Sequence, residues 1–280
     1  MIGRLAPGRA LALAALLYSA SSQAGEQLPL WEVGVGVGGL SFPVYRGSDE
    51  RRDFLFPVPY LVYRGETFKA DRRGVRGEII DHERFQLNIS GSASLPVGGG
   101  EVAARLGMPD LKATVGIGPS IDYKLWQNAG QDLRLDFQLP VRAAFTLQSS
   151  PDFAGWQLAP RLNLGIEHPG GLDGWRMGLL AGPIYGSKHE HEYVYSVAPQ
   201  YATAARPAYD ARGGYGGSQF LVSMSKRFTG YWVGGFVRYD TLKGAVFEDS
   251  PLVHRTDYLA AGFGVSWIIG ESSQRVGADD

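Results

Sequence analysis

The stretch from Leu133 to Leu147 alternates between apolar and polar positions. Every odd position in it is apolar, and five of its seven even positions are polar, among them Arg134, Asp136 and Arg142. Successive side chains of a strand point to opposite faces, so the pattern predicts a strand with one apolar and one polar face. The stretch also exceeds the roughly five or six residues of an ordinary strand and suits the ~9–11 residues that a tilted strand needs to cross a bilayer. It therefore predicts a strand that faces lipid on one side and water on the other.

Similar alternation recurs along the chain. It predicts strands at 30–40, 54–63, 85–97, 111–125, 156–167, 175–186, 217–228, 231–240 and 257–269, with two short strands at 67–71 and 75–81. Pro57 and Pro59 predict a bulge or irregular pairing in the second strand, because proline cannot donate to a ladder. The total is twelve strands if both short segments count and ten if neither does.

The connections alternate in length. Long connections are predicted at 98–110, 187–216 and 241–256, an intermediate one at 149–155, and short ones at 126–131, 168–174 and 229–230. Bacterial outer-membrane barrels have this asymmetry, with short periplasmic turns and longer outer loops. We therefore predict an all-β fold, a closed antiparallel transmembrane β-barrel of about twelve strands, with ten as the alternative. Strands of this length and such regular loop asymmetry disfavour a soluble β-sandwich.

Aromatic residues gather at the predicted strand ends. An interfacial girdle of a barrel lies at this level, where amphipathic rings meet the lipid headgroups. The predicted girdle residues are Trp31, Tyr63, Tyr123, Trp126, Trp156, Trp175, Phe228, Tyr231 and Trp267.

Charged residues occupy the face of the strands that would look into the barrel. They either line a water-filled pore or pair across the interior and close it, and a barrel of intermediate size permits both. Mixed signs with arginine in excess favour a narrow or closed lumen. The predicted lumen-facing residues are Lys112, Asp122, Lys124, Arg134, Asp136, Arg142, Arg161, Glu167, Arg176, Arg238 and Asp240.

The first residues have the pattern of a secretory signal peptide. Arg4 and Arg9 precede a short apolar run at 10–17, and Ser22-Gln23-Ala24 offers a small-x-small cleavage site. This pattern predicts a cleaved signal at 1–24, followed by the barrel at 25–269 and a polar tail at 270–280. The net charge of −1 gives no electrostatic case for a nucleic-acid partner, and the absence of cysteine excludes cysteine-based metal and redox chemistry.

Catalytic and metal-binding patterns are weak. In an extended segment His189 and His191 would face the same way and could share a metal ion, but no third ligand has a known position, so a solvated loop is favoured. No serine stands in a GxSxG elbow, and no histidine lies within a predicted strand. The sequence thus predicts no catalytic residues, no metal site, no cofactor and no enzymatic activity.

Three motifs resemble the MipA/OmpV family of outer-membrane proteins over about residues 30–269. They are the loop 45–48 (YRGS), the strand 57–60 (PVPY) with 63–65 (YRG), and the closing strand 235–239 (GFVRY) with the loop 249–253 (DSPLV). The resemblance implies an outer-membrane location in a Gram-negative bacterium. It also implies a scaffold that binds a murein lytic transglycosylase and a bifunctional murein synthase. A porin-like channel or a small-molecule binder is the alternative that this family offers.

Overall fold

A computed structural model describes residues 27–64, 68–71, 74–82, 84–100 and 102–277. The predicted signal peptide, the turn at 65–67 and the last residues of the tail lie outside this part of the chain. The fold is all-β, as the alternation predicts, and it also contains one short α-helix that the alternation does not predict. No helix among the described residues is long and apolar enough to cross a membrane.

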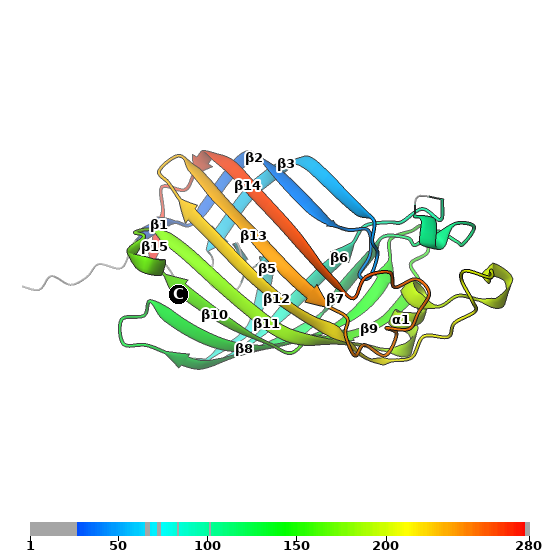
Figure 1. The fold of residues 1–280 in the computed structure, drawn as a ribbon. Coiled ribbons are helices and arrows are strands. Elements are labelled where there is room, and N and C mark those ends of the chain that lie inside the picture. The colour runs from blue at the N-terminus through cyan, green and yellow to red at the C-terminus, as the bar shows by residue number, and fades with distance from the viewer. Residues whose placement is uncertain (1–26, 65–67, 72–73, 83, 101, 278–280) are drawn as a thin grey trace, which may run out of the picture.

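Fifteen strand segments follow one another along the described chain (Figure 1). They are β1 (Gln27–Pro29), β2 (Trp31–Pro43), β3 (Arg51–Arg64), β4 (Phe68–Asp71), β5 (Gly74–His82), β6 (Phe85–Ser94), β7 (Thr114–Gln127), β8 (Leu133–Thr146), β9 (Phe153–Leu158), β10 (Arg161–Glu167), β11 (Trp175–Gly186), β12 (Gly214–Arg227), β13 (Tyr231–Thr241), β14 (Asp257–Glu271) and β15 (Arg275–Gly277). Helix α1 (Lys188–Tyr195) and three 3₁₀ turns, η1 (Ala103–Arg105), η2 (Pro169–Gly171) and η3 (Pro199–Tyr201), lie between them.

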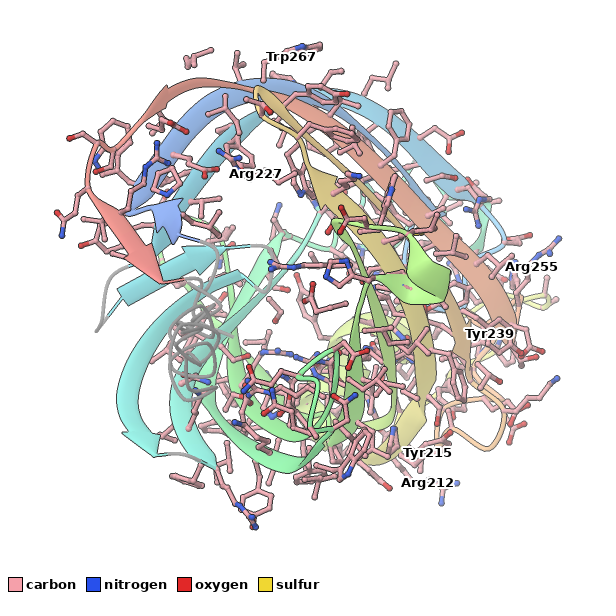
Figure 2. All side chains as sticks on the ribbon, turned by 90° about the vertical axis from the view of Figure 1, so that its left-hand side faces the viewer. Arg212, Tyr215, Arg227, Tyr239, Arg255 and Trp267 are labelled. Carbon is pink, nitrogen blue, oxygen red and sulfur yellow. The ribbon has the colours of Figure 1, made fainter. Side chains whose placement is uncertain are left out.

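Thirteen of these segments form one antiparallel sheet in the order β10-β11-β12-β13-β14-β2-β3-β4-β5-β6-β7-β8-β9. Two further pairings join β10 to β8 and β11 to β9. The strands tilt together and curve round, so that one face of the sheet looks inward (Figure 2). We call the end with the long loops the loop end and the opposite end the turn end. The short segments β1 and β15 pair with each other at the turn end (Figure 1).

The predicted strand at 156–167 is interrupted. Its first part, β9, pairs with residues 141–145 of β8, and its second part, β10, pairs with residues 133–138 of the same strand. Ala159 and Pro160 separate the two parts, because proline at this point cannot donate to a ladder. Because the alternation of apolar and polar residues continues on both sides of a short interruption, the sequence pattern did not reveal this break in the strand.

The prolines of β3 do not disturb its pairing with β2, contrary to the predicted irregularity. Pro57 lies opposite Val37 and Pro59 opposite Val35 in a ladder without a register shift. On the other edge, the β3–β4 ladder is confined to Tyr63 and Arg64. The prolines are tolerated because their missing donors belong to an edge on which no strand pairs at these positions in the described structure.

The long loops pack together into a hydrophobic core of their own. We call the loops 44–50, 95–113, 187–213 and 242–256 the loop cap. Buried side chains from all four of them join one cluster, with Tyr45, Val102, Val197 and Phe247 among its members. The sequence predicted irregular solvated loops here, but apolar side chains from distant segments bury one another.

Candidate functional site

Several of the predicted inward charges pair with each other. Arg134 Nε lies 2.9 and 3.0 Å from the two carboxylate oxygens of Asp136. On the neighbouring wall Arg176 Nε lies 2.7 Å from Glu167 Oε2. Near the loop end Arg238 Nε lies 2.6 Å from Asp240 Oδ2. Such short charge-assisted contacts hold side chains in place along the sheet.

A second group of polar side chains surrounds Asp122. Its carboxylate accepts hydrogen bonds from Ser120 Oγ at 2.7 Å, Asn88 Nδ2 at 3.2 Å and Gln138 Nε2 at 3.3 Å. Gln138 in turn accepts a hydrogen bond from Arg161 Nε at 2.9 Å. This ladder connects β6, β7, β8 and β10 across one wall of the sheet.

Arg142 stands apart from the paired charges. Its Nε donates to Ser90 Oγ at 2.7 Å, two strands away on β6, and the residue is only 9% exposed. In the described part of the chain neither Arg142 nor Arg161 forms an ion pair within 4.0 Å. Arg161 repels Arg142 electrostatically, and Asp122 attracts Arg161. These two guanidinium groups therefore form a cationic site that no carboxylate of the described side chains contacts directly.

One predicted lumen residue, Lys112, differs from the rest. Lys112 precedes β7 in the loop cap, where its ammonium lies 3.9 Å from Asp110 and is half exposed. Lys124 lies on β7 opposite Asp136 of β8. The structure thus gathers most of the predicted inward charges on β7, β8, β10, β11 and β13 and leaves Lys112 at the rim.

The turn end holds a buried ion pair that the sequence analysis did not single out. Glu32 is fully buried, accepts hydrogen bonds from Arg227 Nε at 2.9 Å and from the Tyr60 hydroxyl at 2.8 Å, and belongs to β2. Arg227 also lies 3.3 Å from Glu271 at the end of β14. Figure 2 shows Arg227 inside the curve of the strands and Trp267 outside it. In the sequence Glu32 alternates with the valines of β2, so it lies on the face opposite to theirs. This placement was the available signal for an inward carboxylate.

Hydrogen bonds tie the loops of the cap to one another. The Tyr45 hydroxyl donates to the Leu252 carbonyl at 2.8 Å, and the Tyr195 hydroxyl donates to the Arg46 carbonyl at 3.0 Å. Ser250 Oγ donates to the Tyr195 carbonyl at 2.7 Å, which links 242–256 to 187–213. The loop 95–113 joins through Arg105, whose Nη1 donates to the Val194 carbonyl at 2.9 Å. All four loops therefore form one connected layer at the loop end.

Helix α1 lies within this layer and brings a carboxyl group beside a histidine. Glu190 Oε2 lies 3.2 Å from His191 Nε2, and His191 Nδ1 lies 2.7 Å from the Arg212 carbonyl. Burial raises the pKa of Glu190 to about 7 and lowers the pKa of His191. Both shifts favour the neutral forms of the two side chains, because burial penalises charge.

The histidine pair does not have the predicted geometry. His189 and His191 lie on α1 rather than on an extended segment, so they do not share a face as alternate residues of a strand do. His189 instead stacks on Phe153, with ring centroids 5.8 Å apart, whereas His191 is buried beside Phe247. Among the described residues no group of three or more possible His, Cys, Asp or Glu ligands gathers.

The predicted girdle aromatics gather mainly at the turn end. Trp31, Tyr231 and Trp267 lie near the ends of their strands there and remain about two-fifths to half exposed. Phe228 stacks on Tyr231 with ring centroids 4.5 Å apart. Trp156 lies near the loop end, opposite Ala143 of β8. The other predicted members at the turn end are Tyr63, Tyr123, Trp126 and Trp175.

A comparison with protein families gives one match that covers most of the chain. The family model described as "MltA-interacting protein MipA" matches residues 35–269. No curated protein matches the chain. Among solved structures, the COG4313 outer membrane channel from Pseudomonas putida F1 is 11% identical at a TM-score of 0.45, with 90% of this chain and 100% of that one covered. The outer membrane channel DcaP of Acinetobacter baumannii is 9% identical at a TM-score of 0.36, with 89% and 99% covered. The match over most of its length shows that the chain belongs to the MipA family.

Proposed function

We propose that the protein is a twelve-stranded barrel in the outer membrane of a Gram-negative bacterium, reached through a signal peptide at 1–24. β9 and β10 occupy one strand position between β8 and β11, since each pairs with both of these strands. Counting them as one strand supports the proposal of a closed ring of twelve strands. The exposed aromatic rings at the turn end then meet the lipid headgroups of the periplasmic leaflet.

We propose further that the barrel is a non-enzymatic scaffold for a murein lytic transglycosylase and a murein synthase. The family is described by its interaction with MltA, which supports the first of these partners. The observation that carries the proposal is the β1–β15 sheet, where Gln27–Pro29 pairs with Arg275–Gly277 at the end with the short turns. The tail is therefore held in place, which gives the periplasmic face a shaped surface.

Such a surface must be large enough to bury the area that a stable protein–protein interface needs. A stable interface buries ~800 Å² on each partner, which a two-residue turn cannot supply. The β1–β15 sheet is anchored to the barrel, because the Leu30 amide donates to the Gln274 carbonyl and the Ser272 amide donates to the Trp31 carbonyl, each at 2.9 Å. Together with the neighbouring turns it forms a platform without the ordering cost of a loose tail.

Truncation after Ser273 tests the scaffold. This cut removes β15. It leaves Glu271, the last residue of β14, in its strand ladder opposite Glu32 of β2. We expect pulldown of a purified lytic transglycosylase to fall at least tenfold while the barrel remains folded. The control is Leu106→Asp on the exposed surface of the loop cap, which should leave recovery unchanged. Equal recovery from the truncated and full-length proteins would remove the β1–β15 sheet from the interface.

The inward arginines support a second candidate function, a channel or binder for small anions. Arg142 and Arg161 supply positive charge in the interior, where their hydrogen-bond partners among the described residues are Ser90 and Gln138. The loop cap opposes a wide pore, because its loops are packed and hydrogen-bonded at the outer end. We therefore expect planar bilayers to show no solute-sized conductance steps at neutral pH. Such steps, abolished by Arg142→Gln, would establish the channel in place of a closed interior.

A further inference from the structure

The wall of the sheet is incomplete between β3 and β6. The β3–β4 ladder covers only Tyr63 and Arg64, and the β5–β6 ladder covers only Phe85 to Asn88. Within the described residues, β3 from Asp53 to Pro59 and β6 from Ile89 to Ser94 have strand partners on one edge only. We call this place the wall gap.

Exposure of the side chains supports an opening at this place. On β3 both faces are accessible, since Leu55 is 77% exposed on one face and Phe54 and Phe56 are 38% and 37% exposed on the other. On β6 Ile89 and the small residues from Gly91 to Ser94 are exposed too. At the loop end the gap is bounded by Arg52, whose Nη1 donates to the Pro96 carbonyl at 2.7 Å.

A recess of about 660 Å³ lies at this boundary. Arg52, Asp53 and Phe54 line it from β3, and Pro96, Gly98 and Lys112 line it from the loop before β7. Below the recess the β3 lip is apolar from Phe54 to Pro59, and the β6 lip alternates serines with Ile89, Gly91 and Ala93. A hydrocarbon chain fits such lips because its burial there removes apolar surface from water.

Behind the β6 lip lies the cationic site of the interior. Arg142 crosses β7 to reach Ser90, which belongs to the unpaired part of β6. Gly116 lies beside this crossing. A Cβ there would meet Ser92 Oγ at 2.4 Å and would make an ordinary contact of 3.6 Å with Arg142 Cβ. Among the described residues a hydroxyl is the hydrogen-bond partner of this largely buried guanidinium, and an anion bound beside it would offset the cost of burying its charge.

We propose that the wall gap admits an amphipathic anion from the membrane, with its hydrocarbon chain between the lips and its head group at Arg142 and Arg161. This role goes beyond the scaffold, because it uses the wall and the interior rather than the turn end. The loop cap supports lateral entry, because its four loops pack and hydrogen-bond to one another at the loop end. A guanidinium pair binds a carboxylate, sulfonate or phosphate head through charge-assisted hydrogen bonds.

Binding of 11-(dansylamino)undecanoate to the full-length protein in lipid vesicles tests the head group. We expect Arg142→Gln to weaken binding of this carboxylate at least tenfold and to leave the uncharged analogue dansyl-undecylamide unaffected. Arg176→Gln is the matched control, because it removes an inward arginine that already pairs with Glu167. Equal affinity of the wild-type protein for the charged and uncharged probes would overturn the anion site.

A single introduced cysteine tests the route, since the natural chain has none. Phe56→Cys places a thiol at the gap, and Leu259→Cys places one on the opposite, exposed face of β14. We expect a bulky maleimide at position 56 to slow uptake of the probe from the bilayer at least tenfold and the same label at 259 to have no effect. Unchanged uptake with the label at 56 would overturn the lateral route. Dimers of the protein that the label at 56 disrupts, without any uptake of the probe, would overturn it too.

Discussion

The core of the loop cap predicts a large local effect of one substitution, Phe247→Ala. Phe247 is fully buried, stacks on Tyr195 with ring centroids 3.7 Å apart and meets His191 edge-on at 4.6 Å. Truncating a buried phenylalanine costs about 3–5 kcal/mol. The loss falls on the packing between 242–256 and 187–213 rather than on the strand ladders.

This cost translates into local opening. Each ~1.4 kcal/mol changes an equilibrium tenfold, so the open population of the cap should rise by roughly two to three and a half orders of magnitude. Amide hydrogen exchange of the segment 188–213, followed by mass spectrometry in detergent, measures this directly. The amides of Val197 and Tyr209, which bond each other's carbonyls at 2.8 and 3.0 Å, report on it.

A matched substitution separates the cap core from a general effect. Leu106→Ala removes an apolar side chain that is 65% exposed on the same cap, and it should leave the exchange unchanged. The heat-modifiable migration of both variants should remain that of the parent, because neither residue belongs to a strand. Unchanged exchange in Phe247→Ala with an intact barrel would refute the view that the loops share one core.

Two further predictions concern charge. Arg227→Ala removes a guanidinium that lies 2.9 Å from the fully buried Glu32, so urea unfolding should lose up to about 3–5 kcal/mol, whereas Arg275→Ala in an exposed pair with Glu271 should lose at most ~1 kcal/mol. Because burial raises the pKa of Glu190 to about 7, its contribution to cap stability is fully present below its usual pKa near 4.5 and is lost as the pH rises through about 7. Exchange protection of the segment 188–213, corrected for intrinsic rates, should therefore fall over that window; Glu190→Gln should abolish the fall, and Glu192→Gln should not.

Local alternation predicted the strands well wherever one face is polar. β8 keeps the expected register from Leu133 to Thr146, because a one-residue shift would exchange its charged and apolar faces. Alternation predicted β3 less completely. Phe56 and Tyr60 share one face and Leu55 and Leu61 the other, so both faces are apolar and period two cannot identify the inner one. The hydrogen bond from Tyr60 to Glu32 identifies it in three dimensions.

The helix within the longest loop had a local signal that alternation does not detect. Ser187 accepts a hydrogen bond from the Glu190 amide at 3.3 Å, and a serine three residues before a glutamate is the pattern of a capping box. The core of the loop cap had no such signal. Its members are dispersed from Tyr45 to Tyr258, and only the antiparallel order of the strands in the sheet brings their loops to one end.

The platform and the interior site lie far enough apart to be perturbed independently. Nine strand residues separate Leu133 at the turn end from Arg142, which at ~3.3 Å per residue amounts to about 30 Å. Substitutions so far apart with no shared partner are expected to act additively. Truncation after Ser273 should thus abolish pulldown and leave probe binding intact, and Arg142→Gln should do the reverse. If either change removed both activities, a single conformational change of the barrel would have to connect the periplasmic platform with the wall gap.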